Sequence, residues 1–327
     1  MLVDQFQRRV NYLRLSVTDR CNLRCQYCMP EEGMQWLPSE TLLQDDEIIT
    51  LLQDVYVPLG VNRIRLTGGE PLLRKGIVGL VSRIVNVQGI EELALTTNGV
   101  FLAPMAEHLA RAGLRRVNIS VDSLKPDRFK TITRGGDLAK VLAGVEAASA
   151  AGMIVKLNML VIPGSNEDEL LDFASYTIDR PVQVRYIEMM PLGGDKDFYD
   201  QHQFLPIQTM IDRISEHFAL EDAKQAVPGN GPAKILRIPG AKGTLGFISP
   251  MSNNFCHACN RTRLSADGQI KACLMRPHEM DLLGKLRTGA TPEEMRGMVM
   301  KSLEEKPFHH EWGAGLPVLR TMSRIGG

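Results

Sequence analysis

The sequence lacks long hydrophobic runs and has no excess of charge of either sign. No apolar stretch approaches the about 20 residues of a membrane-spanning helix, so we expect no membrane anchor. The first residues, MLVDQFQRRVNYLRLSV, contain no apolar segment followed by a small-residue cleavage site, which predicts no secretory signal and a cytoplasmic location. Lysine plus arginine and aspartate plus glutamate both number 38, so we expect no global attraction to nucleic acid or an anionic membrane.

Cysteine is also scarce, and its distribution argues against a disulfide framework. The six cysteines form two groups of three: Cys21, Cys25 and Cys28, and then Cys256, Cys259 and Cys273. Cysteines this close together in sequence rarely pair well with one another. In a reducing compartment, clustered cysteines more often hold metal or carry out redox chemistry.

What the sequence does contain is an alternation of strand-like and helix-like segments. Strands are predicted at 12–17, 63–68, 92–98, 116–122, 154–162 and 182–190. Helices are predicted at 45–60, 76–87, 103–113, 139–152 and 166–179. This alternation predicts a parallel sheet with right-handed crossovers. About six strand–helix units precede residue 200, which fits a partial barrel or a doubly wound sheet but not the eight units of a closed barrel.

Polar or glycine-rich clusters follow almost every predicted strand, and sites in parallel α/β folds lie at the carboxyl ends of strands. The first cysteine group is therefore expected at one mouth together with Gly68, Gly69, Glu70, Thr96, Asn98, Ser120 and Asp122. In the C-terminal region, RTRLSADGQIKACL predicts a hairpin that turns at Asp267-Gly268. Such a hairpin returns Cys273 to the side of Cys256 and Cys259.

The first cysteine group has two interpretations. One is a zinc site with a remote fourth ligand, because structural zinc takes four protein ligands. The other is an iron–sulfur cluster that keeps one iron open, and the spacing C-x-x-x-C-x-x-C favours it over the usual zinc pairs. The segment CNLRCQYC resembles the radical S-adenosylmethionine (SAM) signature, and TGGEP at 67–71 resembles the SAM-binding motif of that superfamily. This resemblance implies a [4Fe–4S] cluster on Cys21, Cys25 and Cys28 whose open iron binds SAM.

The spacing of the second cysteine group leaves zinc and a cluster nearly balanced, with His257 or His278 as a possible fourth zinc ligand. The stretch FCHACNRTRLSADGQIKACL and the final MSRIGG resemble the GTP 3′,8-cyclase family of radical SAM enzymes, which opens molybdenum cofactor biosynthesis. The resemblance extends over essentially the whole chain. It implies a second [4Fe–4S] cluster on Cys256, Cys259 and Cys273, with its open iron facing GTP.

The family resemblance also implies contacts with both small molecules. Those with GTP are Arg14, Arg65, Thr96, Lys156, Arg261 and Arg263. Those with SAM are Tyr27, Gly69, Ser120 and Met190. From the residues alone, Arg261 and Arg263 share one face of a strand, as residues two apart do. Arg14 and Arg65 lie in otherwise apolar β-rich runs, where a charge is costly unless it is paired or faces a polar cavity.

The terminal pair Gly326-Gly327 also has two interpretations. From the residues alone it is a flexible tail, whereas the family resemblance implies that it enters the active site and takes part in turnover together with Arg261 and Arg263. The implied reaction starts with a 5′-deoxyadenosyl radical that removes the 3′ hydrogen of GTP. The resulting radical attacks C8 of guanine, and an electron and a proton complete 3′,8-cyclo-7,8-dihydro-GTP.

We therefore expect a partial (βα)6 barrel of the TIM type over residues 1–200 and a smaller C-terminal region over 201–327 that carries the hairpin and the second cluster. The implied partners are GTP, an external one-electron donor and a downstream cyclic pyranopterin synthase, and a homodimer is left open. Two rivals are a different radical SAM enzyme with an auxiliary cluster, such as a peptide-modifying one, and a zinc-binding interaction module. The arginines suit a triphosphate, and an interaction module needs no polar barrel mouth.

Overall fold

A curved, largely parallel sheet forms the centre of the computed structural model, which describes residues 1–192, 196–223, 231–309 and 322–325. The strands are β1 (Tyr12–Ser16), β2 (Arg63–Thr67), β3 (Glu92–Thr97), β4 (Arg116–Ser120), β5 (Ile154–Val161), β6 (Gln183–Glu188), β7 (Glu221–Asp222), β8 (Lys234–Arg237), β9 (Thr244–Ile248), β10 (Arg261–Leu264), β11 (Gln269–Lys271) and β12 (Met280–Asp281). Their spatial order is β12-β11-β10-β1-β2-β3-β4-β5-β6-β9-β8-β7. The first six strands run parallel in chain order, as predicted, and the fold is a partial α/β barrel.

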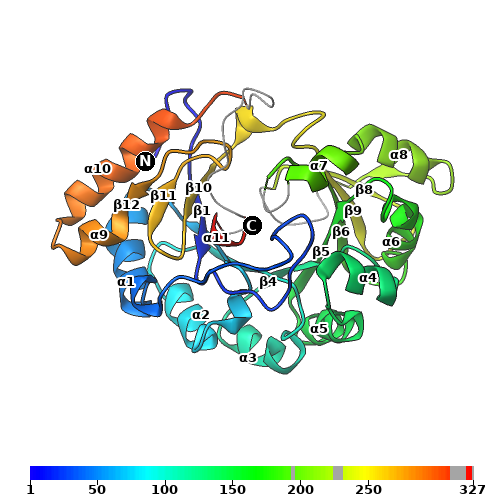
Figure 1. Cartoon of the computed structure of the whole chain (residues 1–327), viewed down its shortest axis with the longest axis horizontal. Helices are drawn as coiled ribbons and strands as arrows, with labels where there is room; N and C mark the ends of the chain where they lie inside the picture. The colour runs from blue at the N-terminus through cyan, green and yellow to red at the C-terminus, as the bar shows by residue number, and fades with distance from the viewer. Residues whose placement is uncertain (193–195, 224–230, 310–321, 326–327) are drawn as a thin grey trace.

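Most of the helices cover the outside of this sheet (Figure 1). The helices of the described residues are α1 (Asp45–Thr50), α2 (Ile77–Val85), α3 (Ala106–Arg111), α4 (Pro126–Thr133), α5 (Leu138–Ala150), α6 (Leu170–Tyr176), α7 (Lys196–His202), α8 (Ile207–Ser215), α9 (Leu282–Arg287), α10 (Pro292–Ser302) and α11 (Met322–Ile325). The first helix continues as a π-helical segment over Leu51–Tyr56. One continuous core of leucine, isoleucine and valine side chains from strands and helices packs between the layers. Among the described residues, no helix is long and apolar enough to cross a membrane.

The C-terminal strands extend the N-terminal sheet at both edges. β10 pairs in parallel with β1, and β9 pairs in parallel with β6, so these two strands flank the six strands of the N-terminal part. The predicted hairpin is confirmed: β10 and β11 are antiparallel, and Gly268 adopts the left-handed φ of +73° that its turn requires. The second cysteine group therefore adjoins the strand that leads to the first.

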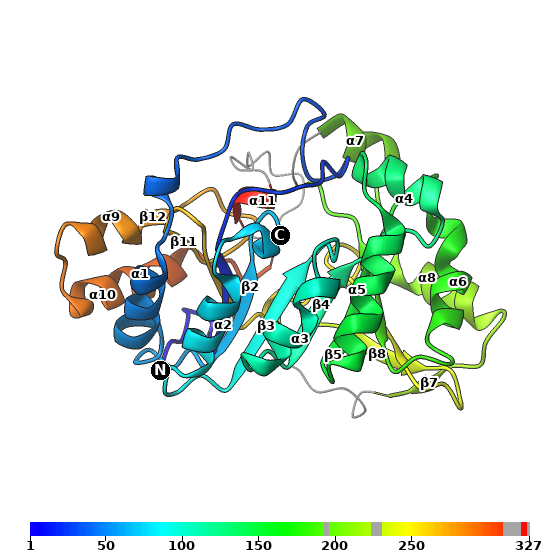
Figure 2. The same ribbon diagram turned by 90° about the horizontal axis from the view of Figure 1, so that it is seen from below.

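Two other features lie at the open end of the barrel. The long loop between β1 and α1 contains the first cysteine group and crosses that end (Figure 2). The short helix α11 lies inside the ring of strands in Figure 1 and near this loop in Figure 2. Its Arg324 Nη2 donates a hydrogen bond of 2.7 Å to the Gln35 carbonyl oxygen, so the end of the described chain reaches the mouth.

Candidate active site

The first cysteine group lies against the ends of β2 and β3, as expected. The backbone amide of Gly69 donates to the Thr18 carbonyl (2.8 Å), and that of Glu70 donates to the Arg20 carbonyl (2.7 Å). From the end of β3, Asn98 Nδ2 lies 3.9 Å from Cys21 Sγ. These contacts join the loop that carries Cys21 to the glycine-rich turn after β2.

Gly68 and Gly69 are needed because two backbone segments approach each other closely. A Cβ on Gly69 would lie 2.3 Å from the Arg20 carbonyl oxygen, and one on Gly68 would lie 2.5 Å from that of Thr18. Both contacts involve backbone atoms, which cannot move aside as a flexible side chain can. The TGGEP motif therefore has a structural role in seating the cysteine loop, besides the SAM contact that the family resemblance implies for Gly69.

The Glu70 carboxylate is buried and holds the end of β3. It accepts hydrogen bonds from Thr97 Oγ1 (2.7 Å), the Asn98 amide (2.7 Å) and the Leu72 amide (3.0 Å). Burial raises the pKa of this carboxyl to about 7, and the three hydrogen bonds act in the opposite direction. Glu70 thus fixes the relative positions of the segments after β2 and β3.

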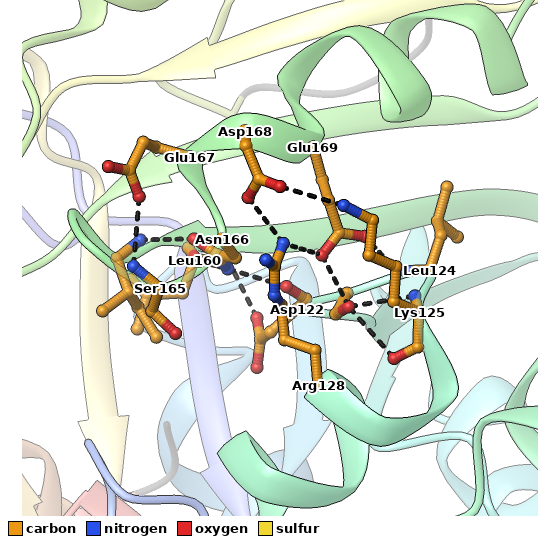
Figure 3. A network of polar contacts seen from close by, with 12 residues as sticks. Asp122, Leu124, Lys125, Arg128, Leu160, Ser165, Asn166, Glu167, Asp168 and Glu169 are labelled. Atoms are coloured by element: carbon orange, nitrogen blue, oxygen red, sulfur yellow. Dashed lines mark hydrogen bonds and ion pairs between the residues drawn. The ribbon is translucent and has the colours of Figure 1, made fainter.

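Tyr27, the aromatic residue of the cysteine signature, is anchored to the loop after β4. Its hydroxyl donates to Asp122 Oδ2 (2.7 Å), and the Leu160 amide donates to Asp122 Oδ1 (2.9 Å). Figure 3 shows the polar network that supports this loop: Asn166 Nδ2 donates to the Asp122 carbonyl, and Arg128 pairs with Asp168 and Glu169. The other predicted SAM contacts, Ser120 and Met190, are half-buried at the ends of β4 and β6.

The three thiols of the first group are close enough to influence one another electrostatically. Burial, followed by Cys28, Asp122 and Cys21, raises the pKa of Cys25 well above its ordinary value. Three thiolates in such a buried place repel one another unless a cationic group binds them, and cysteine thiolates are the usual ligands of iron–sulfur clusters. The donor set therefore fits the cluster. In the described part of the chain, no three His, Cys, Asp or Glu side chains lie close enough together to hold a single metal ion. A four-iron cluster is larger than a single ion and needs its ligands farther apart.

The second cysteine group lies at the start of β10, next to two of the predicted GTP residues. Cys256 begins a short 3-10 turn that Cys259 follows, and the Met275 amide lies 3.4 Å from Cys273 Sγ after the hairpin. Burial acts to raise the pKa of Cys259, but the positive charges of Lys306, Arg261 and Arg263 outweigh it and leave that pKa below its ordinary value. This surrounding positive charge favours a thiolate, the form that binds iron.

Three arginines occupy matching positions on three neighbouring strands. Arg14 of β1 is in register with Arg263 of β10 on one side and with Arg65 of β2 on the other. In-register residues of a parallel sheet point to the same face, and like charges placed directly opposite destabilise the pair. A row of three arginines therefore destabilises the ligand-free protein through charge repulsion, and it is suited to bind a polyanion.

This row belongs to a larger set of buried and half-buried cations inside the barrel, which we call the basic group. Its members are Arg14, Arg65, Arg116, Lys156, Arg185, Arg261 and Arg263. The charges of Arg65 on β2 and Arg261 on β10 act on Arg185 of β6 even though these strands are not neighbours, which places the three side chains in one shared interior. The Nε atoms of Arg65 and Arg185 are buried without a hydrogen-bond partner.

Burial and mutual repulsion weaken the protonation of several members of the basic group. Burial, and then the positive charge of Arg185, lowers the pKa of Lys156 to about 7. Burial, and then Arg261, lowers the pKa of Arg263 to about 10. Arg116 forms an ion pair with Glu92, which offsets part of the positive charge. A bound anion would relieve the remaining repulsion.

Thr96 and Lys156 share one row of the sheet with Asn118, a residue that sequence reasoning did not select. Asn118 of β4 is in register with Thr96 of β3 and with Lys156 of β5, and its Nδ2 donates to Thr96 Oγ1 (3.4 Å). Arg185 was also missed, and its Nη2 donates to Asn118 Oδ1 (2.7 Å). The signal that singled out Arg14, a charge inside an apolar β-rich run, is equally present at Arg185 in VQVRYIEMM.

Another missed residue is Glu188, at the end of β6. This fully buried carboxylate accepts hydrogen bonds from the amides of Ile207 (2.8 Å), Met251 (2.8 Å) and Ser252 (2.9 Å). Through these hydrogen bonds, Glu188 holds the loop before Cys256 against the end of β6, close to Met190. No sequence pattern marks a carboxylate whose partners are backbone amides from distant segments.

Comparison with known proteins identifies the chain. Residues 15–177 match the Radical SAM superfamily, and residues 182–312 match the family Molybdenum Cofactor Synthesis C. A GTP 3′,8-cyclase of Pelotomaculum thermopropionicum is 47% identical over 326 residues, which cover 99% of each chain. One of Listeria monocytogenes is 45% identical over 336 residues, covering 100% of this chain and 99% of the relative. The chain belongs to the GTP 3′,8-cyclase family.

Solved structures agree at the level of the fold. SuiB of Streptococcus suis, crystallised with the precursor peptide SuiA, superposes with a TM-score of 0.62 at 12% identity, over 93% of this chain and 66% of SuiB. The structure anSMEcpe with bound AdoMet gives a TM-score of 0.56 at 15% identity, over 92% of this chain and 83% of that one. This member of the GTP 3′,8-cyclase family is thus a radical SAM enzyme, and a [4Fe–4S] cluster and SAM belong to that superfamily.

The roles predicted for the individual site residues and the second [4Fe–4S] cluster stay predictions. Gly326 and Gly327 lie outside the described residues. The division into 1–200 and 201–327 stays a prediction: the two family matches meet between residues 177 and 182, and strands from both parts share one sheet.

Proposed function

We propose that this chain cyclises GTP to 3′,8-cyclo-7,8-dihydro-GTP by SAM-dependent radical chemistry, as the first step of molybdenum cofactor biosynthesis. The observation that carries the proposal is the position of the basic group, which lines the inside of the barrel with the in-register row of Arg263, Arg14 and Arg65. This row starts on β10, which directly follows Cys259, and includes β1, which leads to Cys21. A triphosphate bound there brings a nucleotide between both cysteine groups.

The basic group selects and orients the substrate. Guanidinium groups match phosphate oxygens in charge and in forked geometry, so Arg14, Arg65 and Arg263 act on the triphosphate together with Lys156. Arg185, held by Asn118, adds another buried guanidinium to the same interior. Because these cations are already desolvated by the fold, binding a polyanion does not require them to lose hydration at that moment.

The cysteines hold the cofactors in this proposal. Cys21, Cys25 and Cys28 ligate the cluster that binds SAM, beside Tyr27, Gly69, Ser120 and Met190. The reduced cluster and SAM together supply the 5′-deoxyadenosyl radical that removes the 3′ hydrogen of GTP. Cys256, Cys259 and Cys273 would hold a second [4Fe–4S] cluster, which would offer an open iron to the guanine, and both Arg261 and Arg263 lie within electrostatic reach of these cysteines.

The C-terminal tail completes the site. The hydrogen bond from Arg324 to Gln35 brings the residues just before Gly326 to the barrel mouth, which supports a role for the glycine pair in turnover. An external donor supplies the electron that starts the reaction, and a separate cyclic pyranopterin synthase consumes the product.

The test is metal analysis followed by an assay under strictly anaerobic conditions. After reconstitution we expect about eight irons per chain and little zinc, and SAM cleavage that depends on GTP and not on ATP. About four irons with one zinc would turn the second cysteine group into a structural site and contradict the GTP assignment. Zinc alone would contradict the radical SAM chemistry altogether.

A further inference from the structure

The first residues of the chain and the segment that follows α10 meet beneath the second cysteine loop. Gln5 Nε2 donates to the Glu304 carbonyl (2.9 Å), and the rings of Phe6 and Phe308 lie 5.2 Å apart. The first residues and the segment after α10 therefore form one layer. This layer packs against the backbone of Cys256–Arg261, on which the second cluster is proposed to bind.

Arg8 contributes the N-terminal half of this contact. Its Nη1 donates to the Cys256 carbonyl (2.6 Å), and its Nη2 donates to the Pro307 carbonyl (2.9 Å). Its Nε pairs with Asp4 Oδ2 at 2.5 Å. Arg8 is 7% exposed and Asp4 is 4% exposed, so this ion pair is buried and the Arg8 charge is largely compensated.

Lys306 contributes the C-terminal half, and its charge is not compensated in the same way. Its Nζ donates to the carbonyls of Cys259 (2.9 Å) and Arg261 (2.7 Å), which are neutral acceptors. The side chain is only 2% exposed, although a buried ammonium group is costly. Asp4, a carboxylate whose charge reaches Lys306, is already paired with Arg8.

We infer that Lys306 is a positioning residue that adds positive charge beneath the second cluster and raises the reduction potential of that cluster. Together with Arg8, it also fixes the loop that carries the cluster. Reducing a thiolate-bound cluster adds a negative charge, which a nearby buried cation stabilises. Lys306 lies within electrostatic reach of both Cys259 and Cys273. Its ammonium therefore makes the cluster easier to reduce. The inference rests on the proposed second cluster.

The experiment is a redox titration of the full-length, reconstituted protein, followed by electron paramagnetic resonance. Cys21, Cys25 and Cys28 are replaced by serine so that only the second cluster gives a signal. Lys306→Met removes the charge and both hydrogen bonds, and Lys306→Arg keeps the charge. Lys301→Met is the matched control, because Lys301 is an exposed lysine of α10.

We expect Lys306→Met to shift the midpoint potential to a more negative value, Lys306→Arg to stay near the parent value, and Lys301→Met to leave it unchanged. An unchanged potential in Lys306→Met with four irons retained would overturn the inference. If Lys306→Met loses its irons, the iron content of Lys306→Gln is compared with that of Lys306→Arg. The glutamine variant keeps a hydrogen-bond donor but lacks the charge.

Loss of iron in both uncharged variants but not in Lys306→Arg would support a role of the charge in holding the cluster. Loss in Lys306→Arg as well would reduce the role to packing and overturn the inference. A parent protein that binds no iron at this site would instead contradict the proposed second cluster. The two failures are therefore distinguishable by the iron content of the parent.

Discussion

At the scale of single residues, the cations of the barrel interior favour anion binding but lower the stability of the ligand-free protein. Arg14, Arg65 and Arg263 lie in one row, and Lys156 and Arg185 repel each other from the neighbouring strands β5 and β6. Such a cluster is poorly stabilised without a counter-charge. Each of these cations therefore has opposite effects on stability and on nucleotide binding.

Lys156 should couple nucleotide binding to proton uptake. Its folded pKa of about 7 lies below the ordinary value of 10.5, so the stability that comes from the neutral amine is present at high pH and is lost as the pH falls through 7. A bound triphosphate favours the charged amine and raises this pKa. We expect uptake of close to one proton per GTP bound at pH 8, measured by calorimetry in buffers of different ionisation enthalpy.

The control for this prediction is Lys156→Met, in which the proton uptake at pH 8 should disappear. At pH 6 the wild-type amine is already charged in the ligand-free protein, so little uptake should occur on its account. Equal proton uptake in the wild type and in Lys156→Met would show that another group is responsible.

Arg185→Met tests the residue that sequence reasoning missed. Losing one charged hydrogen-bonding partner of a phosphate costs about 1.5–3 kcal/mol, so GTP should bind roughly ten- to a hundredfold more weakly. SAM binding should be unchanged, and the unfolding temperature of the ligand-free protein should not fall, because a buried repulsion is removed. Arg180→Met, a change at the surface, is the control; unaltered GTP affinity in Arg185→Met would exclude Arg185 from the site.

At the scale of elements, the glycine-rich turn after β2 decides how closely the cysteine loop can approach. Gly69→Ala would place a Cβ 2.3 Å from a backbone carbonyl oxygen, so one of the two segments must move. We expect this variant to lose the iron of the first cluster and to be destabilised by about 1–3 kcal/mol. Iron content and denaturant unfolding measure the two effects.

Gly79→Ala is the matched control for that prediction. Gly79 lies in α2, and nothing stands within 4 Å of the Cβ that alanine would add. Alanine in a helix interior is favoured over glycine by up to about 1 kcal/mol, so this variant should be slightly more stable and keep its iron. Normal iron binding by Gly69→Ala would show that the turn does not seat the cysteine loop.

The elements also show how far sequence alone can reach. All six predicted strands are confirmed to within about two residues at their ends, because their apolar residues pack in the core of the protein. Helix α4, over Pro126–Thr133, was missed because its sequence is mostly polar and only Phe129, Ile132 and Thr133 are buried. The pairing of β9 and β10 with the outer strands β6 and β1 was also missed, since no local pattern encodes contacts between segments so distant in the chain.

The same division holds within the site. Sequence spacing marks Cys21, Cys25 and Cys28 and the pair Gly68-Gly69. A charge inside an apolar run marks the arginines of β1 and β2. Glu188 and Lys306 do not stand out in the sequence, because they bind backbone amides or carbonyls far away in sequence. A side chain that binds the backbone leaves no complementary residue type for sequence reasoning to find.

At the scale of the whole molecule, both chain ends return to the site: the N-terminal residues to the second cysteine loop, and α11 to the barrel mouth. Deleting Gly326 and Gly327 should leave iron content and SAM binding at wild-type levels and abolish product formation. Chromatography of the reaction mixture measures the product. Full cyclisation by the truncated chain would refute a role of the tail in turnover.

The central claim is that one site joins SAM cleavage to hydrogen abstraction from GTP. The most direct measurement is an anaerobic reaction with GTP deuterated at C3′, analysed by mass spectrometry. The account predicts that deuterium appears in 5′-deoxyadenosine and that a cyclised product forms with it. Unlabelled 5′-deoxyadenosine, or the same yield without GTP, would contradict the claim.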